Sequence, residues 1–351
     1  MLKMIRAALI ALAAAIFAAV PVVATAQPLQ AIKVSYQPAL YWALPFYIAT
    51  EKGWWAEVGL KPEFSIFPAG VPQIAASASK SWDVGGTGSI PAVLGSVRFN
   101  IQTIGITNDE SQGNGLMVRG DKAAQLMQNP ASMKGQTILL TANSTGDFAV
   151  QSCLAKYGLK KADVTLKNMG QAEIISALSS NAAELVGVWA PNIYTLEEKT
   201  GAKLFCTGKD GGVMVPGALI VRADYAKENP ENVAKFLAVY LRAWKWANAN
   251  RKEAIAMMKK FYEEGGVQIS EAAMAREFDT RPTFDLASQV KIMDRAGGPS
   301  QVDGWFTTIA EFMKGSGSIQ EAPAAKTYIT DDYMKKVASD PKLREFANRD
   351  K

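Results

Sequence analysis

The 351-residue chain contains no histidine. This absence excludes Ser-His-Asp triads, Cys-His pairs and zinc sites of the usual histidine-containing kinds. Walker-type phosphate loops are also missing, and Gly86-Thr87-Gly88 lacks the third glycine of a dinucleotide fingerprint. Ser79-Lys80 does not fit the Ser-x-x-Lys frame of a lysine-assisted serine enzyme. We therefore expect no enzyme, no cofactor and no metal site.

Cysteine is nearly absent, since Cys153 and Cys206 are the only two. An oxidising compartment would permit a disulfide between them. Separation along the sequence says nothing about distance in space, however, so a disulfide and two buried free thiols both remain open.

Long apolar runs are confined to the N-terminus. A short basic segment precedes the apolar stretch 7–20, Pro21 interrupts it, and Ala24-Thr25-Ala26 offers the small residues that a signal peptidase reads. We expect residues 1–26 to be a cleaved signal peptide and the mature chain to start at Gln27. An uncleaved membrane anchor is the alternative, because this segment is nearly long enough to span a bilayer.

The sequence contains no segment in which charges of one sign cluster. The 38 Lys and Arg residues outnumber the 33 Asp and Glu residues by only five, and no basic run occurs. Nucleic acid is therefore not an expected partner. Hydrophobic residues make up 48% of the chain, which is typical of globular proteins. Because one hydrophobic core rarely serves so long a chain, we expect two domains. We also expect the protein to be a monomer.

Strand-like and helix-like segments alternate along the first two thirds of the chain. Residues 32–36, 60–67 and 101–107 are strand-like, and residues 44–58 have helical spacing. This β-α-β order predicts an α/β fold with parallel sheets and helices on both faces. Helical patterns dominate from Glu231 onward, which predicts an α-rich C-terminal wrap.

Two apolar segments, residues 113–119 and 216–222, have the character of crossovers between domains, since each follows a glycine-rich turn and ends in arginine. A chain that crosses twice makes the first domain discontinuous, with residues 31–116 plus 222–345. Residues 117–221 then form an inserted second domain. A ligand cleft would lie between the carboxyl ends of the two sheets.

Four loops at the expected strand ends carry residues that could contact a ligand in this cleft. Aromatic side chains can form an apolar wall, whereas glycine and hydroxyl residues before a helix allow free backbone N–H groups to bind an anion. Each loop also has a purely structural explanation, as core, tight turn or helix N-cap. The loops are residues 36–42 with Gln37, Tyr41 and Trp42, residues 87–89 with Gly88 and Ser89, residues 143–145 with Ser144 and Thr145, and residues 188–191 with Trp189.

Short motifs occur along the chain in a specific order and spacing. They are Val34-Ser35-Tyr36-Gln37, Glu51-Lys52-Gly53-Trp54-Trp55, Val58-Gly59-Leu60, Asp83-Val84-Gly85, Gly88-Ser89-Ile90-Pro91, Leu139-Leu140 with Ser144-Thr145, Val188-Trp189-Ala190-Pro191, and Val221-Arg222 with Tyr225, Asn229-Pro230 and Phe236. In this order they resemble the periplasmic binding proteins of the nitrate/sulfonate/taurine class, which includes the group named for a thiamine-pyrimidine biosynthesis protein. The resemblance covers most of the mature chain and is greatest to taurine and aliphatic-sulfonate binders.

This resemblance implies a two-domain type II periplasmic-binding-protein fold. It also implies capture of a small-molecule ligand in the periplasm and its delivery to the permease of an ABC importer. Carried over by position, the ligand contacts are Gln37, Tyr41, Gly88, Ser89, Ser144, Thr145 and Trp189, to which we add Trp42 and Asn114.

The chain departs from the taurine binders where a carboxylate would pair with the ligand's ammonium group. Residues 215–218 contain no acid, and Asn114 stands where the resemblance implies a glutamate. Asp109 and Glu110 either supply the missing negative charge near the ligand or are solvated. A sulfonate without an amine, or a less polar organic ligand, therefore fits as well as taurine. An enzyme of the pyrimidine-synthase branch and a sensory binding module are the alternatives to transport.

Overall fold

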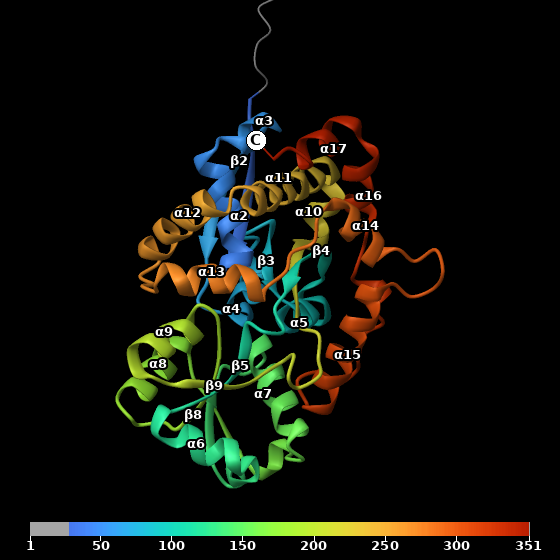
Figure 1. Ribbon diagram of the computed structural model, residues 1–351. Helices are drawn as coiled ribbons and strands as arrows, with labels where there is room; N and C mark the ends of the chain where they lie inside the picture. The colour runs from blue at the N-terminus through green and yellow to red at the C-terminus, as the bar shows by residue number, and fades with distance from the viewer. Residues whose placement is uncertain (1–27, 351) are drawn as a thin grey trace, which may run out of the picture.

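The computed structural model describes residues 28–350 and consists of two lobes, each built on a five-stranded sheet flanked by helices (Figure 1). The expected α/β class is therefore confirmed. The predicted signal peptide and its cleavage site lie outside the described residues. Among residues 28–350, no helix is both long and apolar enough to cross a membrane.

The first lobe, at the top of Figure 1, contains a sheet with strand order β2-β1-β3-β10-β4. Strand β1 is parallel to β2 and β3, whereas β10 runs antiparallel to β3 and β4. The strands are β1 (Gln30–Tyr36), β2 (Leu60–Ile66), β3 (Val84–Gly88), β4 (Ile101–Asp109) and β10 (Pro216–Arg222).

The second lobe contains a sheet with strand order β7-β6-β8-β5-β9. Strand β6 is parallel to β7 and β8, whereas β5 runs antiparallel to β8 and β9. The strands are β5 (Asn114–Val118), β6 (Thr137–Leu140), β7 (Thr165–Asn168), β8 (Leu185–Trp189) and β9 (Lys203–Thr207). Its helices are α6 (Gly120–Gln128), α7 (Thr145–Lys156), α8 (Gln171–Ser179) and α9 (Asn192–Thr200).

The expectation of purely parallel sheets is wrong, because each sheet contains one antiparallel strand, β10 or β5. These two strands enter their sheet from the other lobe, so no β-α-β connection forces them to be parallel. The crossovers themselves are residues 110–113 and 208–215. The domain boundaries expected after residues 116 and 221 thus fall inside β5 and β10.

The helices of the first lobe include an α-rich C-terminal region that wraps around its sheet (Figure 1). A single helix over residues 44–58 was expected, but two helices occur, because Gly53 takes a left-handed φ of 71°. The helices are α2 (Leu40–Glu51), α3 (Trp54–Glu57), α4 (Gly70–Ala76), α5 (Ser89–Phe99), α10 (Ala223–Glu228), α11 (Pro230–Ala249), α12 (Arg251–Glu264), α13 (Glu271–Thr280), α14 (Leu286–Met293), α15 (Gln301–Gly315), α16 (Asp332–Ser339) and α17 (Pro341–Ala347).

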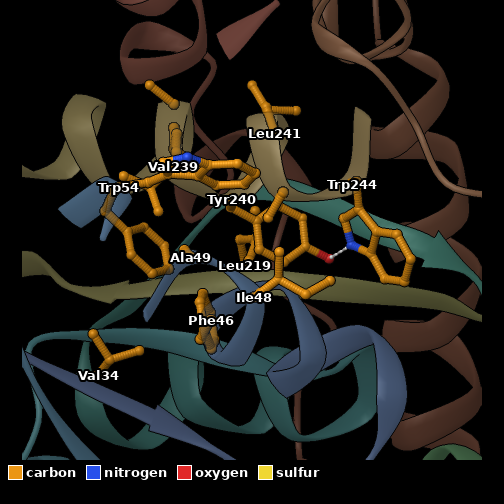
Figure 2. Close-up of a cluster of buried hydrophobic side chains, with 14 of the residues drawn as sticks. Val34, Phe46, Ile48, Ala49, Trp54, Leu219, Val239, Tyr240, Leu241 and Trp244 are labelled. Atoms are coloured by element: carbon orange, nitrogen blue, oxygen red, sulfur yellow. Dashed lines mark hydrogen bonds between the residues drawn. The ribbon is translucent and has the colours of Figure 1, made fainter. Parts of the chain in front are cut away.

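An aromatic core joins α2 and α11 over one face of the first sheet (Figure 2). The rings of Phe46 and Phe236 lie 5.5 Å apart, and the indole N–H of Trp244 donates to the hydroxyl of Tyr240 over 2.7 Å. Aromatic pairs at this spacing add about 0.5–1.5 kcal/mol to the burial of their surface. This packing fixes the position of α2 and therefore the position of Trp42, which belongs to its first turn.

The two cysteines form a disulfide between Cys153 of α7 and Cys206 of β9, which decides between the alternatives that the sequence left open. Helix α7 is therefore covalently attached to the strand that precedes the second crossover.

Candidate functional site

A small cavity lies between the two lobes, at the carboxyl ends of strands from both sheets. Its volume is about 10 Å³, which is about the space that a single ordered water molecule needs. It is lined by Gln37, Trp42, Gly70, Gly88 and Pro91 of the first lobe and by Ser144, Thr145 and Trp189 of the second. In this form the cavity has no room for an organic ligand, so a ligand can enter only when the lobes are further apart.

The first-lobe side of the cavity is built on a buried hydrogen-bond network. Gln37 follows β1, and its Nε2 donates to Oε1 of Gln73 over 2.6 Å and to the hydroxyl of Thr87 over 2.8 Å. Nε2 of Gln73 donates in turn to the carbonyl of Gly86 over 3.0 Å and to the hydroxyl of Ser35 over 2.9 Å. The network fixes the orientation of both amide groups.

On the second-lobe side, Ser144 is the N-cap of α7. Its hydroxyl accepts from the backbone N–H of Asp147 over 3.2 Å and donates to the carbonyl of Thr141 over 2.7 Å. Thr145, the first residue of the helix, donates its hydroxyl proton to Oδ1 of Asn114 over 2.8 Å. Asn114 begins β5, so a strand and a helix together position the threonine.

Helices α5 and α7 begin at this cavity, one from each lobe. Gly88, the N-cap of α5, lies so close to Thr145 that an added Cβ would come within 2.7 Å of its Cγ2. The hydroxyl of Ser89 is completely buried and has no hydrogen-bond partner among the described residues. Each helix N-terminus carries free N–H groups and a partial positive charge.

Two tryptophans close the cavity from opposite lobes. Trp42 comes from the first turn of α2, which starts within the segment expected to be a loop, and Trp189 is the last residue of β8. Trp42 is 2% exposed and Trp189 is 7% exposed, so both are part of the cavity wall and of the protein interior. The side chain of Tyr41 lies outside the described part of the structure.

Glu110 lies in the first crossover, behind Asn114 and Trp42. It is completely buried, so the alternative that it is solvated is wrong. Nδ2 of Asn114 donates to its carboxylate over 3.1 Å, and the guanidinium of Arg281 lies 3.7 Å away. Burial raises the pKa of Glu110 to about 7, although Arg281 and the side chains of Asn114 and Trp42 favour the carboxylate.

The two crossovers lie side by side and are hydrogen-bonded to each other. The N–H of Glu110 donates to the carbonyl of Val215 over 2.7 Å, and the N–H of Val215 donates to the hydroxyl of Ser111 over 3.0 Å. The N–H of Lys209 donates to the carbonyl of Ser111 over 2.9 Å. This paired connection is where a hinge motion between the lobes would take place.

Sequence reasoning missed the buried groups that support the cavity. Gln73 lies in a helix of small residues and Arg281 in the helical tail, and neither belongs to a recognisable motif. Glu110 was considered only together with Asp109, and nothing in the sequence distinguishes the buried acid of the two. Within residues 28–350 no group of three or more acidic or cysteine side chains could hold a metal ion.

The chain is similar to known binding proteins in both sequence and structure. The family described as "NMT1/THI5 like" matches residues 43–254. A Bacillus subtilis protein named for the binding of aliphatic sulfonates is 27% identical over 64% of this chain and 68% of its own length. The taurine-binding periplasmic protein of Escherichia coli is 27% identical over 58% of this chain and 62% of its own.

Among solved structures, the alkanesulfonate-binding protein SsuA from Xanthomonas axonopodis pv. citri, bound to MOPS, superposes with a TM-score of 0.72. The comparison covers 86% of this chain and 99% of that one, at 18% identity. At this level of identity the likeness shows a shared fold. The two-lobed periplasmic-binding-protein architecture expected from the sequence is thereby confirmed.

Proposed function

Because this chain belongs to the NMT1/THI5-like family, we propose that it is a binding protein that captures a small organic anion of the sulfonate or taurine kind between its lobes and delivers it to an ABC importer. The curated relatives described above are named as binding proteins and not as enzymes. The complete absence of histidine agrees with a protein that binds its ligand without catalysing a reaction.

The meeting of two helix N-termini at one cavity between the lobes carries this proposal. Each N-terminus contributes about 0.3–1 kcal/mol of dipole attraction to an anion, in addition to the hydrogen bonds from its free N–H groups. Ser89, the first residue of α5, directly follows the lining residue Gly88, and its buried hydroxyl has no partner among the described residues, so we propose it as a further donor. Trp42 and Trp189 cover the apolar part of a short ligand.

The proposed working place of the protein is the periplasm, where it acts as a monomer with the importer's permease as its partner. The layout of residues 1–26 supports export, since it has the basic, apolar and small-residue parts of a signal peptide. The disulfide agrees with an oxidising compartment.

Isothermal titration calorimetry with taurine, ethanesulfonate, nitrate and glutamate tests this function. We expect a sulfonate to bind with a Kd in the micromolar range, which corresponds to about −8 kcal/mol. Ser89→Ala should weaken that binding by about tenfold, the effect of about 1.4 kcal/mol. Ser77→Ala is the matched control, because its buried hydroxyl bonds only to the carbonyl of Ile74 within the first lobe.

Two results would contradict the proposal. A protein that binds nothing in this panel is not a sulfonate-binding protein. A protein whose Ser77 and Ser89 variants both bind as tightly as the wild type holds its ligand at another place.

A further inference from the structure

Glu110 lies at the point where the first crossover meets both lobes. Its carboxylate accepts from Nδ2 of Asn114, the first residue of β5 in the second lobe, over 3.1 Å. On the first-lobe side the carboxylate lies beside Gly217 of β10, where an added Cβ would come within 2.5 Å of Oε1 of Glu110 and 2.9 Å of Nε1 of Trp42. The backbone N–H of Glu110 is bonded to the second crossover, at the carbonyl of Val215. Side chains of both lobes therefore enclose this carboxylate at the hinge.

The carboxylate is incompletely hydrogen-bonded in the closed form. Its Oε1 is buried and makes no hydrogen bond among the described residues. The indole N–H of Trp42, which is buried nearby, also lacks a partner of normal geometry, although it is close enough to favour the negative charge. Nη2 of Arg281 lies 3.7 Å from Oε2 of Glu110 and attracts the charge without a hydrogen bond to it. An ionised carboxylate in such a site is unfavourable, and either a proton or water removes much of that cost.

The charged groups around Glu110 do not compensate for its burial. Arg281, which follows α13, attracts its charge but also pairs with Glu277 of that helix over 2.8 Å. Asp109 of β4 repels the charge. Tyr240 of α11 also faces the cluster and stays neutral, because burial raises its pKa further above the usual value. Burial is thus the larger influence on Glu110, and it raises the pKa of this carboxyl to about 7.

We propose that Glu110 is a pH-sensitive switch between the closed and open forms of the ligand-free protein. When Glu110 is protonated, its neutral side chain suits the water-free joint between the lobes. When it is ionised, it favours the open form, in which water hydrates the carboxylate. The switch operates without a ligand and does not rest on the proposed function.

Opening changes the surroundings of Glu110 on the side of the cavity. Asn114 accepts the hydroxyl proton of Thr145 over 2.8 Å, and Thr145 in turn faces Gly88 of the first lobe. When the lobes separate, Asn114 and Thr145 move away from Gly88 and Trp42 together, and water reaches the carboxylate between them. Hydration favours the ionised form, so the open protein holds the proton less tightly than the closed protein.

Two protonation equilibria give the direction of the effect. In the closed form Glu110 keeps its proton up to about pH 7, whereas a fully hydrated glutamate loses its proton near pH 4.5. The closed form is therefore favoured most below this lower value, and the preference is lost as pH rises through the window to 7. Between pH 5 and pH 8 we expect the ratio of closed to open protein to fall by about tenfold or more, since each pH unit within the window changes it by up to about tenfold.

Small-angle scattering of the ligand-free protein between pH 5 and pH 8 tests this switch. We expect the radius of gyration of the wild type to rise with pH, because the open population increases. Glu110→Gln keeps an acceptor for Asn114 but does not titrate, so this variant should stay compact at pH 8 and lose the dependence on pH. Glu63→Gln, which removes an exposed acid of β2, is the matched control and should respond to pH as the wild type does.

The reciprocal measurement titrates Glu110 itself. Carbon NMR of its side-chain carboxyl group should give a midpoint near pH 7 in the wild type. Gly88→Ala forces the lobes apart through its contact with Thr145, so in this variant the midpoint should lie lower by about one pH unit or more. Gly304→Ala, where an added Cβ has nothing within 4 Å, is the control and should leave the midpoint unchanged.

Three results would overturn the inference. The first is a wild-type radius of gyration that does not change with pH, and the second is a change of equal size in Glu110→Gln. The third is a carboxyl midpoint that is the same in the wild type and in Gly88→Ala. None of these results bears on the proposed sulfonate-binding function, because no ligand is present in either experiment.

Discussion

At the scale of single residues, the closest approach between the lobes depends on a missing side chain. Gly88 faces Thr145, and a Cβ at position 88 would lie 2.7 Å from Cγ2 of the threonine. We expect Gly88→Ala to weaken ligand binding at least tenfold, because the lobes can no longer close fully. The Tm of the ligand-free variant should change little, because separation of the two lobes relieves the clash. Calorimetry and thermal unfolding measure the two effects.

Gly304→Ala is the control for this substitution. Gly304 lies in α15, and an added Cβ would have nothing within 4 Å. Alanine in a helix is favoured over glycine by roughly 0.5–1 kcal/mol, so this variant should be slightly more stable and bind normally. If Gly88→Ala binds as well as Gly304→Ala, the contact between Gly88 and Thr145 does not limit closure.

Glu110 gives the stability of the ligand-free protein a definite dependence on pH. An unfolded chain loses this proton near pH 4.5, whereas burial holds the folded pKa at about 7. The folded state therefore binds more protons between these values, and the free energy of unfolding falls as pH rises through this window, by up to roughly 3 kcal/mol. Urea unfolding at pH 5, 6, 7 and 8 should show this decline.

Glu110→Gln should reduce that slope, since glutamine does not titrate. A smaller decline should remain, because burial also raises the pKa of Glu277. A variant whose stability falls with pH as steeply as that of the wild type would show that Glu110 is not the titrating group.

The residues around the cavity also show how far sequence reasoning reaches. Gln37, Gly88, Thr145 and Trp189 stand at strand ends or helix starts, where α/β proteins place ligands, so their position near a cleft follows from local patterns. Glu110 and Arg281 are 171 positions apart in the numbering, and their pairing depends on the C-terminal helices returning to the first crossover. Local patterns contain no information about such a return.

At the scale of secondary-structure elements, the disulfide attaches α7 to β9 and closes a loop with a sequence separation of 53. Loops of this length are stabilised by about 4 kcal/mol in the chain-entropy account. We expect a Cys153→Ala, Cys206→Ala double variant to lose about this much unfolding free energy. Reductant should destabilise the wild type toward the same value and leave the variant unchanged. Equal sensitivity of both proteins to reductant would contradict this.

Element order was predictable where the chain stays within one lobe. The alternation of strands and helices in residues 30–109 and 114–207 gives the parallel part of each sheet. The direction of β5 and β10 was not predictable from that alternation. Each is inserted between two strands of a sheet after a crossover, and its direction depends on where the crossover enters.

At the scale of the whole molecule, the structure is a closed form, in which contacts between lobes accompany the small cavity. Helix α13 of the first lobe lies against α9 of the second (Figure 1). Arg276 pairs with Glu197 and lies 4.4 Å over the ring of Tyr194, and the hydroxyl of Ser270 donates to Glu198 over 2.6 Å. Opening must break these contacts, whereas the hydrogen bonds between the crossovers can persist.

Removing Arg276 should therefore shift the ligand-free protein toward an open form. Exposed ion pairs contribute about 0–1 kcal/mol, so Arg276→Ala should weaken ligand binding by a factor of about two to five. Small-angle scattering should show a larger radius of gyration for the ligand-free variant than for the ligand-free wild type. At saturating ligand the two should coincide, because the ligand restores closure.

Lys336→Ala is the matched control, since Lys336 forms an exposed ion pair with Glu231 inside the first lobe. It should change neither the affinity nor the scattering. If Arg276→Ala is equally silent, closure is held by the contacts at the cavity itself, between Gly88 and Thr145. If the Arg276→Ala variant keeps its larger radius of gyration at saturating ligand, the contacts between α13 and α9 are needed for the closed form to exist. Scattering with and without ligand therefore distinguishes the contacts between these helices from the contact between Gly88 and Thr145.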